Sequence, residues 1–143
     1  MNKVTIKIKR LHPDAKIPIY ATKEAGGFDF YSIADFTIPA GKVVKIPMGL
    51  SMEIPEGYCL QMLSRSGLMS KGIYQMVGII DSDYRGEIHF IMFNTTEKDF
   101  KIEKGDRIAQ GIIMPVFKTT FKEVKELSKT ERGSGGFQST GKK

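Results

Sequence analysis

Short segments in which apolar and polar residues alternate recur along most of this 143-residue chain. Near the N-terminus, Val4, Ile6 and Ile8 alternate with lysines and a threonine, a period of two that is typical of a β-strand with one buried face. Turn signals such as Pro39-Ala40-Gly41 and Pro55-Glu56-Gly57 separate the segments. The pattern predicts an all-β barrel or sandwich. Strands are expected over 3–9, 28–32, 42–46, 50–54, 58–63, 77–80, 88–94, 107–117 and 121–124, with a short helical turn over 66–71.

Two of these predicted strands are apolar on both faces, over 88–93 and 112–117. A sheet with one face in water does not require this. We therefore expect either a second sheet or a neighbouring subunit to cover the second face.

Length and composition exclude several classes of protein. A chain of 143 residues predicts one domain. It has no run of 18 apolar residues and no apolar leader after Met1, so we expect neither a membrane span nor a secretory signal, and a cytoplasmic protein is the default. Cys59 is the only cysteine, and there are only two histidines, which excludes an internal disulfide and a zinc site of several histidines.

The net charge of +6 is compatible with nucleic acid, an acidic surface or an anionic small molecule. The basic residues form no Lys/Arg run with interleaved aromatics. We interpret them mainly as a solvated surface, with weak support for an anionic ligand. A basic nucleic-acid-binding β-barrel is disfavoured because no stacking platform is evident.

Five segments carry residues suited to chemistry. The segment 78–87 places acids, a tyrosine and an arginine between apolar strands, which fits either a hairpin turn or an acid poised as general base. The segment 64–68 fits either a capped turn or a phosphate cradle of backbone N–H groups, an arginine and a hydroxyl. The segments 104–110 and 25–30 are each, in isolation, compatible with an ordinary turn. The tail 132–141 combines glycines with an arginine, an aromatic and hydroxyls.

In order and spacing, these segments resemble the five motifs of the homotrimeric deoxyuridine triphosphatase (dUTPase) family. The matching stretches are 26–30, 65–68, 78–86, 105–110 and 132–141. The resemblance implies a distorted jelly-roll or β-barrel subunit in a homotrimer whose active sites are shared between subunits. It implies a barrel domain over 1–127 and a flexible, glycine-rich C-terminal arm over 128–143 that closes over the active site.

The implied activity is hydrolysis of dUTP to dUMP and pyrophosphate, which supplies dUMP and keeps uracil out of DNA. Asp81 would orient and deprotonate the water that attacks the α-phosphorus in line. Mg²⁺ would sit on the triphosphate, with Asp29 touching only its water shell and no direct protein ligand. The implied substrate-binding residues are Arg65, Ser66, Gly67, Gln75, Gly78, Ile79, Ile80, Tyr84, His89, Gln110, Arg132, Gly135, Gly136, Phe137, Gln138, Ser139 and Thr140.

Three roles within this set follow from the resemblance. The Tyr84 ring would pack where a ribose carries its 2′-hydroxyl, and backbone groups over 76–80 would pair with the uracil edge. Phe137 would cover the base. The expected partners are dUTP and two further copies of the chain, with no stable nucleic acid and no membrane, in the cytoplasm or in the host cytoplasm if the source is viral.

Three positions depart from the usual family pattern. Ser64 replaces a common proline, Gln75 an asparagine that contacts uracil, and Gln138 a glycine. Two related readings are a deoxycytidine triphosphate deaminase, which would need a glutamate beside the base, and a catalytically weak nucleotide-binding regulatory protein of the same fold. The presence of Asp81, Tyr84 and Arg132 argues against both.

Overall fold

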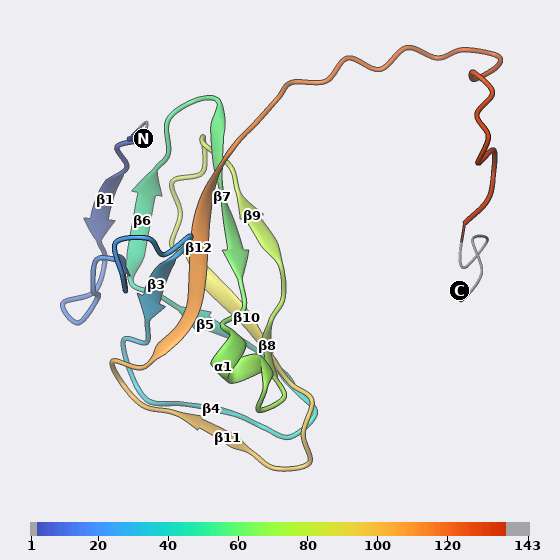
Figure 1. Ribbon diagram of the computed structural model, residues 1–143. Helices are drawn as coiled ribbons and strands as arrows, with labels where there is room; N and C mark the ends of the chain where they lie inside the picture. Colours follow the sequence, from blue (N-terminus) through green and yellow to red (C-terminus); the bar gives the residue numbers. More distant parts are fainter. Residues whose placement is uncertain (1–2, 137–143) are drawn as a thin grey trace.

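The computed structural model describes residues 3–136 and is built almost entirely of β-strands (Figure 1). Its one helix, α1 (Ser66–Met69), is a single turn. The strands are β1 (Lys7–Arg10), β2 (Ile19–Tyr20), β3 (Phe28–Tyr31), β4 (Phe36–Ile38), β5 (Val43–Pro47), β6 (Leu50–Glu53), β7 (Tyr58–Leu63), β8 (Ile73–Gln75), β9 (Gly78–Ile80), β10 (His89–Asn94), β11 (Phe100–Ile102) and β12 (Arg107–Pro115).

The strands form four antiparallel sheets that enclose one core. The largest sheet has the order β2-β3-β12-β7-β9, and it faces a smaller sheet of order β5-β10-β8. The pairs β1-β6 and β11-β4 cover the remaining sides (Figure 1). Phe30 and Phe90 are fully buried, and their ring centroids lie 4.9 Å apart. This contact joins the two main sheets. The arrangement of strands in sheets around one core confirms the predicted all-β fold.

Most predicted strands are confirmed, and one is wrong. The alternation over 58–63 and 88–94 corresponds to β7 and β10, and the predicted helical turn corresponds to α1. The strand predicted over 121–124 is absent from the described residues. Phe121 is 93% exposed, and its segment has no partner strand with which to form backbone hydrogen bonds. Local alternation of apolar and polar residues was therefore not enough to make this segment a strand.

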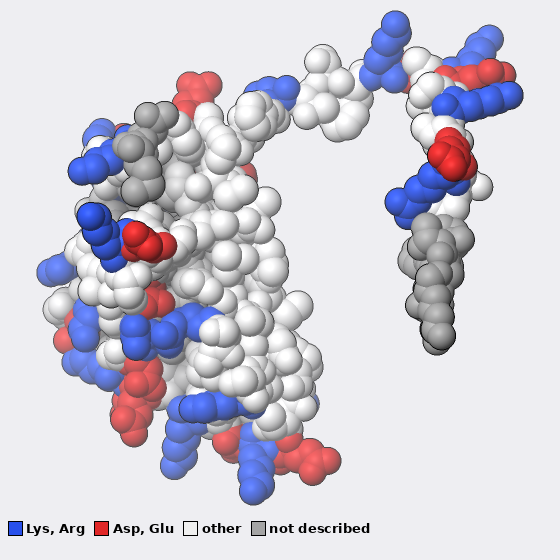
Figure 2. All heavy atoms as spheres, in the orientation of Figure 1, with Lys and Arg blue, Asp and Glu red and all other residues white. Residues whose placement is uncertain are grey.

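The second face of two apolar strands remains open in the single chain. Ile88, Phe90 and Met92 are buried, whereas Ile91 is 42% exposed. In the second of these strands, Met114 of β12 is 39% exposed, and Ile79 of β9 in the same sheet is 62% exposed. Figure 2 shows that the surface over β12, β7 and β9 carries almost no charged side chains, while charges gather on other parts of the barrel. An open, uncharged face of this kind is typical of a protein interface.

After β12 the chain leaves the barrel. Residues 116–136 extend away from it without regular strands (Figure 1). This segment exposes large apolar side chains, among them Phe117, Phe121 and Leu127, which are 86–93% exposed. No helix in the described part of the chain is long and apolar enough to cross a membrane.

Candidate functional site

A cationic hollow lies where β3 and β12 meet the turn after β7. It has a volume of about 220 Å³ and is lined by Ala21, Ala25, Gly26, Gly27, Asp29, Arg65, Ser66, Gly67, Arg107 and Gln110. These residues come from three segments that are far apart in sequence but adjacent in the sheet, because β12 pairs with β3 on one side and with β7 on the other. The structure thus brings together the predicted phosphate ligands Arg65, Ser66, Gly67 and Gln110.

Asp29 organises the arginines of this hollow. Its carboxylate lies 3.1 Å from Nε of Arg65 and 3.2 Å from Nη1 of Arg107. Arg65 also donates a hydrogen bond from Nη1 to the carbonyl of Arg107 at 2.7 Å. Asp29 is 7% exposed, so its charge is balanced by two guanidinium groups in a largely buried setting. Both guanidiniums are therefore held side by side at the rim of the hollow.

Gln110 and Gly27 shape the opposite wall. The Gln110 amide donates from Nε2 to the carbonyl of Ser64 at 2.8 Å. A Cβ added at Gly27 would lie 3.0 Å from Oε1 of Gln110 and 3.1 Å from the carbonyl of Gly111, so a larger residue would press on this wall. By contrast, a Cβ at Gly67 would meet no atom within 4 Å, and the backbone of Gly67 is open to a ligand.

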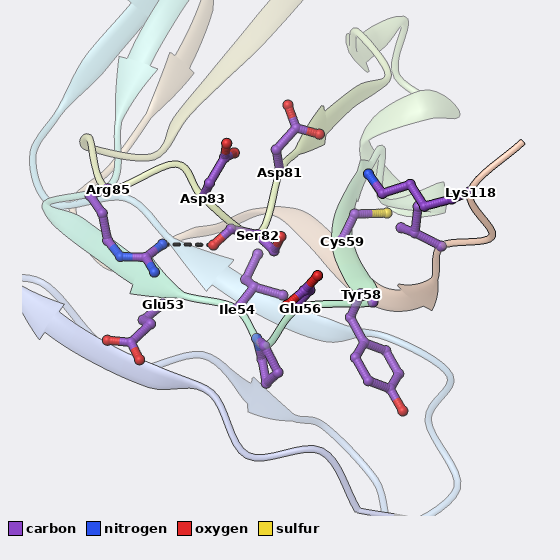
Figure 3. A pocket seen from close by; sticks show the side chains of 13 residues that line it. Glu53, Ile54, Glu56, Tyr58, Cys59, Asp81, Ser82, Asp83, Arg85 and Lys118 are labelled. Carbon is purple, nitrogen blue, oxygen red and sulfur yellow. Dashed lines mark hydrogen bonds between the residues drawn. The ribbon is translucent and has the colours of Figure 1, made fainter.

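A second hollow, of about 700 Å³, surrounds Asp81. Figure 3 shows Asp81, Ser82 and Asp83 on the loop after β9, with the carboxylates of Asp81 and Asp83 pointing away from the segment that carries Ile54, Glu56 and Tyr58. Lys118, from the segment that leaves the barrel after β12, completes the lining together with Arg85. Lys7 donates a hydrogen bond to Glu53 at 2.8 Å and lowers the pKa of that carboxyl. The hollow therefore contains several carboxylates and two basic side chains.

Arg85 and Gly86 hold the loop that carries Asp81 and Tyr84. The guanidinium of Arg85 donates to the carbonyl of Ser82 at 2.7 Å (Figure 3) and to that of Tyr84 at 3.1 Å. The Tyr84 hydroxyl donates to the carbonyl of Glu87 at 3.0 Å. The ring of Tyr84 passes so close to Gly86 that any Cβ there would collide with it. Glycine is therefore required at position 86 for this placement of the tyrosine.

His89 and Glu87 connect this loop to the turn before β6. Nδ1 of His89 is 2.9 Å from the carbonyl of Glu87, and the Glu87 carboxylate accepts a hydrogen bond from the backbone N–H of Gly49 at 2.9 Å. His89 is half-buried. In this structure its ring contacts protein atoms at the base of the loop.

The predicted base-binding residues lie around the connection between β8 and β9. Gly78, Ile79 and Ile80 form β9, which pairs with β7. The side chain of Gln75 is buried and donates from Nε2 to the carbonyl of Met76. Its Oε1 has no hydrogen-bond partner among residues 3–136. Gln75 therefore retains an unused capacity to accept a hydrogen bond. Leaving a buried acceptor unpaired costs folding free energy.

The two hollows of one chain are well separated. Ile80 pairs with Leu60 near the start of β7, so Asp81 lies beside that end, whereas Arg65 follows the far end. At about 3.3 Å per residue, roughly 15 Å of chain separates Leu60 from Arg65. The Arg65 guanidinium also turns toward β3 and β12, whereas β9 lies on the other side of β7. The hollows share no lining residue.

The described part of the arm carries three predicted ligands. Nε of Arg132 donates to the carbonyl of Gly135 at 2.8 Å, which closes a tight turn that also includes Gly136 at its end. None of these residues lines either hollow, and the orange-to-red segment that carries them extends away from the barrel (Figure 1). The predicted ligands Phe137, Gln138, Ser139 and Thr140 lie outside the described residues.

Arg107 and Ser64 were not among the predicted site residues. Arg107 lines the phosphate-sized hollow and pairs with Asp29. The sequence feature that could have identified Arg107 was its position within the segment 105–110. For Ser64, that feature was its departure from the proline that is common in the family.

The all-β fold and the cationic hollow together define an anion-binding β-barrel protein. Comparison with known sequences identifies which one: the chain matches the family described as dUTPase over residues 13–141. It is 50% identical over 140 residues to a deoxyuridine 5′-triphosphate nucleotidohydrolase of Nautilia profundicola, covering 96% of this chain and 99% of that protein. The corresponding Clostridium tetani enzyme is 46% identical, with 99% and 100% covered. The chain belongs to the dUTPase family.

Solved structures agree with this assignment. The dUTPase of Staphylococcus bacteriophage 80alpha with dUPNHPP has a TM-score of 0.90 and 30% sequence identity, and the match covers 96% of this chain and 98% of that one. The resemblance inferred from the five sequence motifs is thereby confirmed.

Proposed function

We propose that this chain hydrolyses dUTP to dUMP and pyrophosphate, with Asp81 orienting and deprotonating the attacking water. Hydrolysis of dUTP is the activity for which its curated relatives are named. The alternative of a catalytically weak regulatory protein gains no support from these names. The observation that carries the proposal is the convergence of Arg65, Ser66, Gly67 and Gln110 on one hollow.

The hollow has the donors that a triphosphate needs. Guanidinium groups bind phosphate oxygens through charge-assisted hydrogen bonds, and Asp29 holds two of them in place. Ser66 adds a hydroxyl. The open backbone at Gly67 lets a phosphate approach N–H groups at the start of α1, which have no partner within the helix. Interactions of this kind stabilise the charge that develops on the pyrophosphate leaving group.

The proposed substrate is the Mg²⁺ complex of dUTP. The hollow offers guanidinium, amide, hydroxyl and backbone N–H donors, and both oxygens of its one carboxylate already face arginines. Such a set fits the phosphates and leaves the cation to the triphosphate oxygens, where it neutralises part of their charge. A contact of Asp29 with the water shell of the ion remains a prediction.

Asp81 supplies the base chemistry. The accepting atom of a general base has to lie within about 3 Å of the atom from which it removes a proton. Asp81 is exposed and lies at the larger hollow, so an attacking water has access to its carboxylate. No covalent nucleophile is needed. Tyr84, fixed against Gly86, would exclude a ribose 2′-hydroxyl, and the backbone over 76–80 would pair with the uracil edge.

We infer that the active site is shared between chains of a homotrimer. Asp81 and Arg65 of one chain lie toward opposite ends of β7, Asp81 after the neighbouring strand β9 and Arg65 turned toward β3 and β12 on the other side, so they do not reach the same triphosphate. An Asp81 from one subunit facing the cationic hollow of another would complete the site. The uncharged face that includes Val77, Ile79 and Met114 gives such an assembly a surface to bury (Figure 2).

The arm is proposed to bring the remaining groups. Extending from the barrel, residues 116–136 are long enough to reach a neighbouring subunit (Figure 1). Arg132 and the residues that follow would then close over the bound nucleotide, at an ordering cost of about 1 kcal/mol per residue fixed.

The direct test is pyrophosphate release from each deoxynucleoside triphosphate in turn. We expect rapid release from dUTP with Mg²⁺, and far slower release from dTTP, dCTP and dATP. Comparable rates on all four substrates would contradict the proposed function. Light scattering at micromolar concentration would give the mass of a trimer, and a monomeric mass would contradict the shared site.

A further inference from the structure

We propose that Ser64 is a positioning residue that fixes the base-binding connection between β8 and β9 relative to the phosphate-binding turn. This inference rests on the proposed function, in which the backbone over 76–80 reads the uracil edge. Ser64 itself lines neither hollow. It acts through the residues to which it is hydrogen-bonded.

One hydroxyl group holds both backbone polar groups of Gln75. Oγ of Ser64 accepts a hydrogen bond from the N–H of Gln75 at 2.8 Å and donates one to its carbonyl at 3.0 Å. In an extended strand, the N–H and C=O of one residue point to the same side, so a single hydroxyl can satisfy both. Gln75 is 4% exposed, and water does not readily replace these bonds.

The bonds lie where the chain passes from one sheet to the other. Gln75 pairs with Met92 of β10 in the smaller sheet, and Gly78 pairs with Met62 of β7 in the larger sheet. Between them, 76–77 cross from sheet to sheet. Ser64 directly follows β7, and its hydroxyl takes the place of a partner strand for the last residue of β8.

Ser64 is also linked to the phosphate hollow. Its carbonyl accepts the hydrogen bond from Nε2 of Gln110, and the next residue in the chain is Arg65. The hydroxyl thus joins the base-binding connection to the same short turn that carries the phosphate ligands. Alanine or proline at position 64 would preserve the carbonyl but remove the hydroxyl.

Loss of the hydroxyl should affect recognition of the base more than the chemical step. Two buried backbone groups of Gln75 would lose their partner, and 75–77, which precede the β7–β9 pairing, would gain freedom to move. Asp81 is held separately, through the β7–β9 pairing and the Arg85 contacts. We therefore expect Ser64→Ala to raise KM for dUTP by about fivefold or more, with kcat changed by less than about twofold. Selectivity for dUTP over dTTP should fall, because the wall against a 5-methyl group is loosened.

The experiment compares Ser64→Ala with Ser64→Thr and Ser70→Ala. Threonine keeps the hydroxyl and should restore KM and selectivity. Ser70 donates from its hydroxyl to the carbonyl of Gly67 at 3.1 Å in the same turn, without touching Gln75, so Ser70→Ala should change neither value. Unchanged selectivity in Ser64→Ala, or an equal loss in Ser70→Ala, would overturn the proposal.

Amide hydrogen exchange separates this inference from the proposed function. Exchange over 73–80 should be faster in Ser64→Ala than in the parent protein, whatever substrate the protein cleaves. Unchanged exchange would overturn the positioning role. A parent protein that releases no pyrophosphate from dUTP would contradict the proposed function instead. If Ser64→Ala does not fold, Ser64→Cys, with a weaker donor and acceptor, is measured by the same two methods.

Discussion

The carboxylate of Asp29 lies 3.1 Å from the guanidinium of Arg65, although Asp29 belongs to β3 and Arg65 to the turn after β7. The same carboxylate pairs with Arg107. Without it, two adjacent guanidinium groups would repel each other when no substrate is bound. Asp29 therefore preorganises the phosphate hollow, which reduces the cost of arranging these side chains during binding.

Asp29→Asn should weaken both substrate binding and the fold. The neutral amide removes the charge that balances Arg65 and Arg107, and we expect a loss of about 1–2 kcal/mol in unfolding free energy, since Arg107 is partly exposed. KM for dUTP should rise. Asp14→Asn is the matched control, because Asp14 pairs with exposed Lys104 at 2.8 Å and should cost little. Equal urea midpoints for the two variants would contradict the role given to Asp29.

Gly67→Ala should impair binding without affecting stability. A Cβ at position 67 meets nothing in the protein within 4 Å, so thermal unfolding should be unchanged. A phosphate approaching this backbone would meet the new methyl group, so KM should rise. Gly111→Ala is the opposite case: its Cβ would lie 2.6 Å from Leu60 and 3.0 Å from Phe30, and it should lower the melting temperature. Unchanged KM in Gly67→Ala would show that phosphates do not contact this turn.

Asp81→Asn should bind dUTP with near-normal affinity and hydrolyse it about 10²- to 10⁴-fold more slowly. Asparagine preserves the size of the side chain but does not accept the proton from water. Binding by calorimetry and turnover by pyrophosphate release would separate the two effects. Near-normal turnover would rule out Asp81 as the base.

Tyr84→Ala should gain relative activity on uridine triphosphate, because the ring would no longer occupy the space of a 2′-hydroxyl. Tyr84→Phe keeps the ring and loses only the hydrogen bond to Glu87, so it should retain the preference for the deoxy substrate. Gly86→Ala should resemble Tyr84→Ala, since its Cβ displaces the ring. The measurement is the ratio of kcat/KM values for dUTP and uridine triphosphate in each variant. An unchanged ratio in Tyr84→Ala would show that the ring does not exclude the 2′-hydroxyl.

Much of the barrel was predictable from the sequence because its longer strands keep a period of two between clear turns. Tyr58–Leu63 begins after Gly57, whose φ of +84° suits a turn that only glycine adopts readily. The short pair Phe36–Ile38 and Phe100–Ile102 was missed, because three residues are too few to establish a period. The segment 121–124 shows the converse error, since alternation cannot reveal whether a partner strand exists.

The candidate site was only partly predictable. The motifs identified Arg65, Asp81 and Gln110 through their order along the chain. The pairing of Asp29 with Arg107 depends on β3 lying beside β12, a contact across 78 positions of sequence. The two hydrogen bonds between the Ser64 hydroxyl and the backbone of Gln75, one donated and one accepted by the hydroxyl, depend on the end of β7 meeting the end of β8. Neither relationship leaves a local pattern in the sequence.

The central claim is that Asp81 and the cationic hollow of different chains form one active site. Its most direct test uses two inactive variants, Asp81→Asn and Arg65→Ala, coexpressed with different affinity tags and purified through both. Each variant supplies the group that the other lacks. If sites are shared, every doubly tagged trimer contains both variants and should have about one third of its sites intact, and it should release pyrophosphate accordingly. If doubly tagged trimers are as inactive as either parent variant, both groups act within one chain and the shared site is wrong.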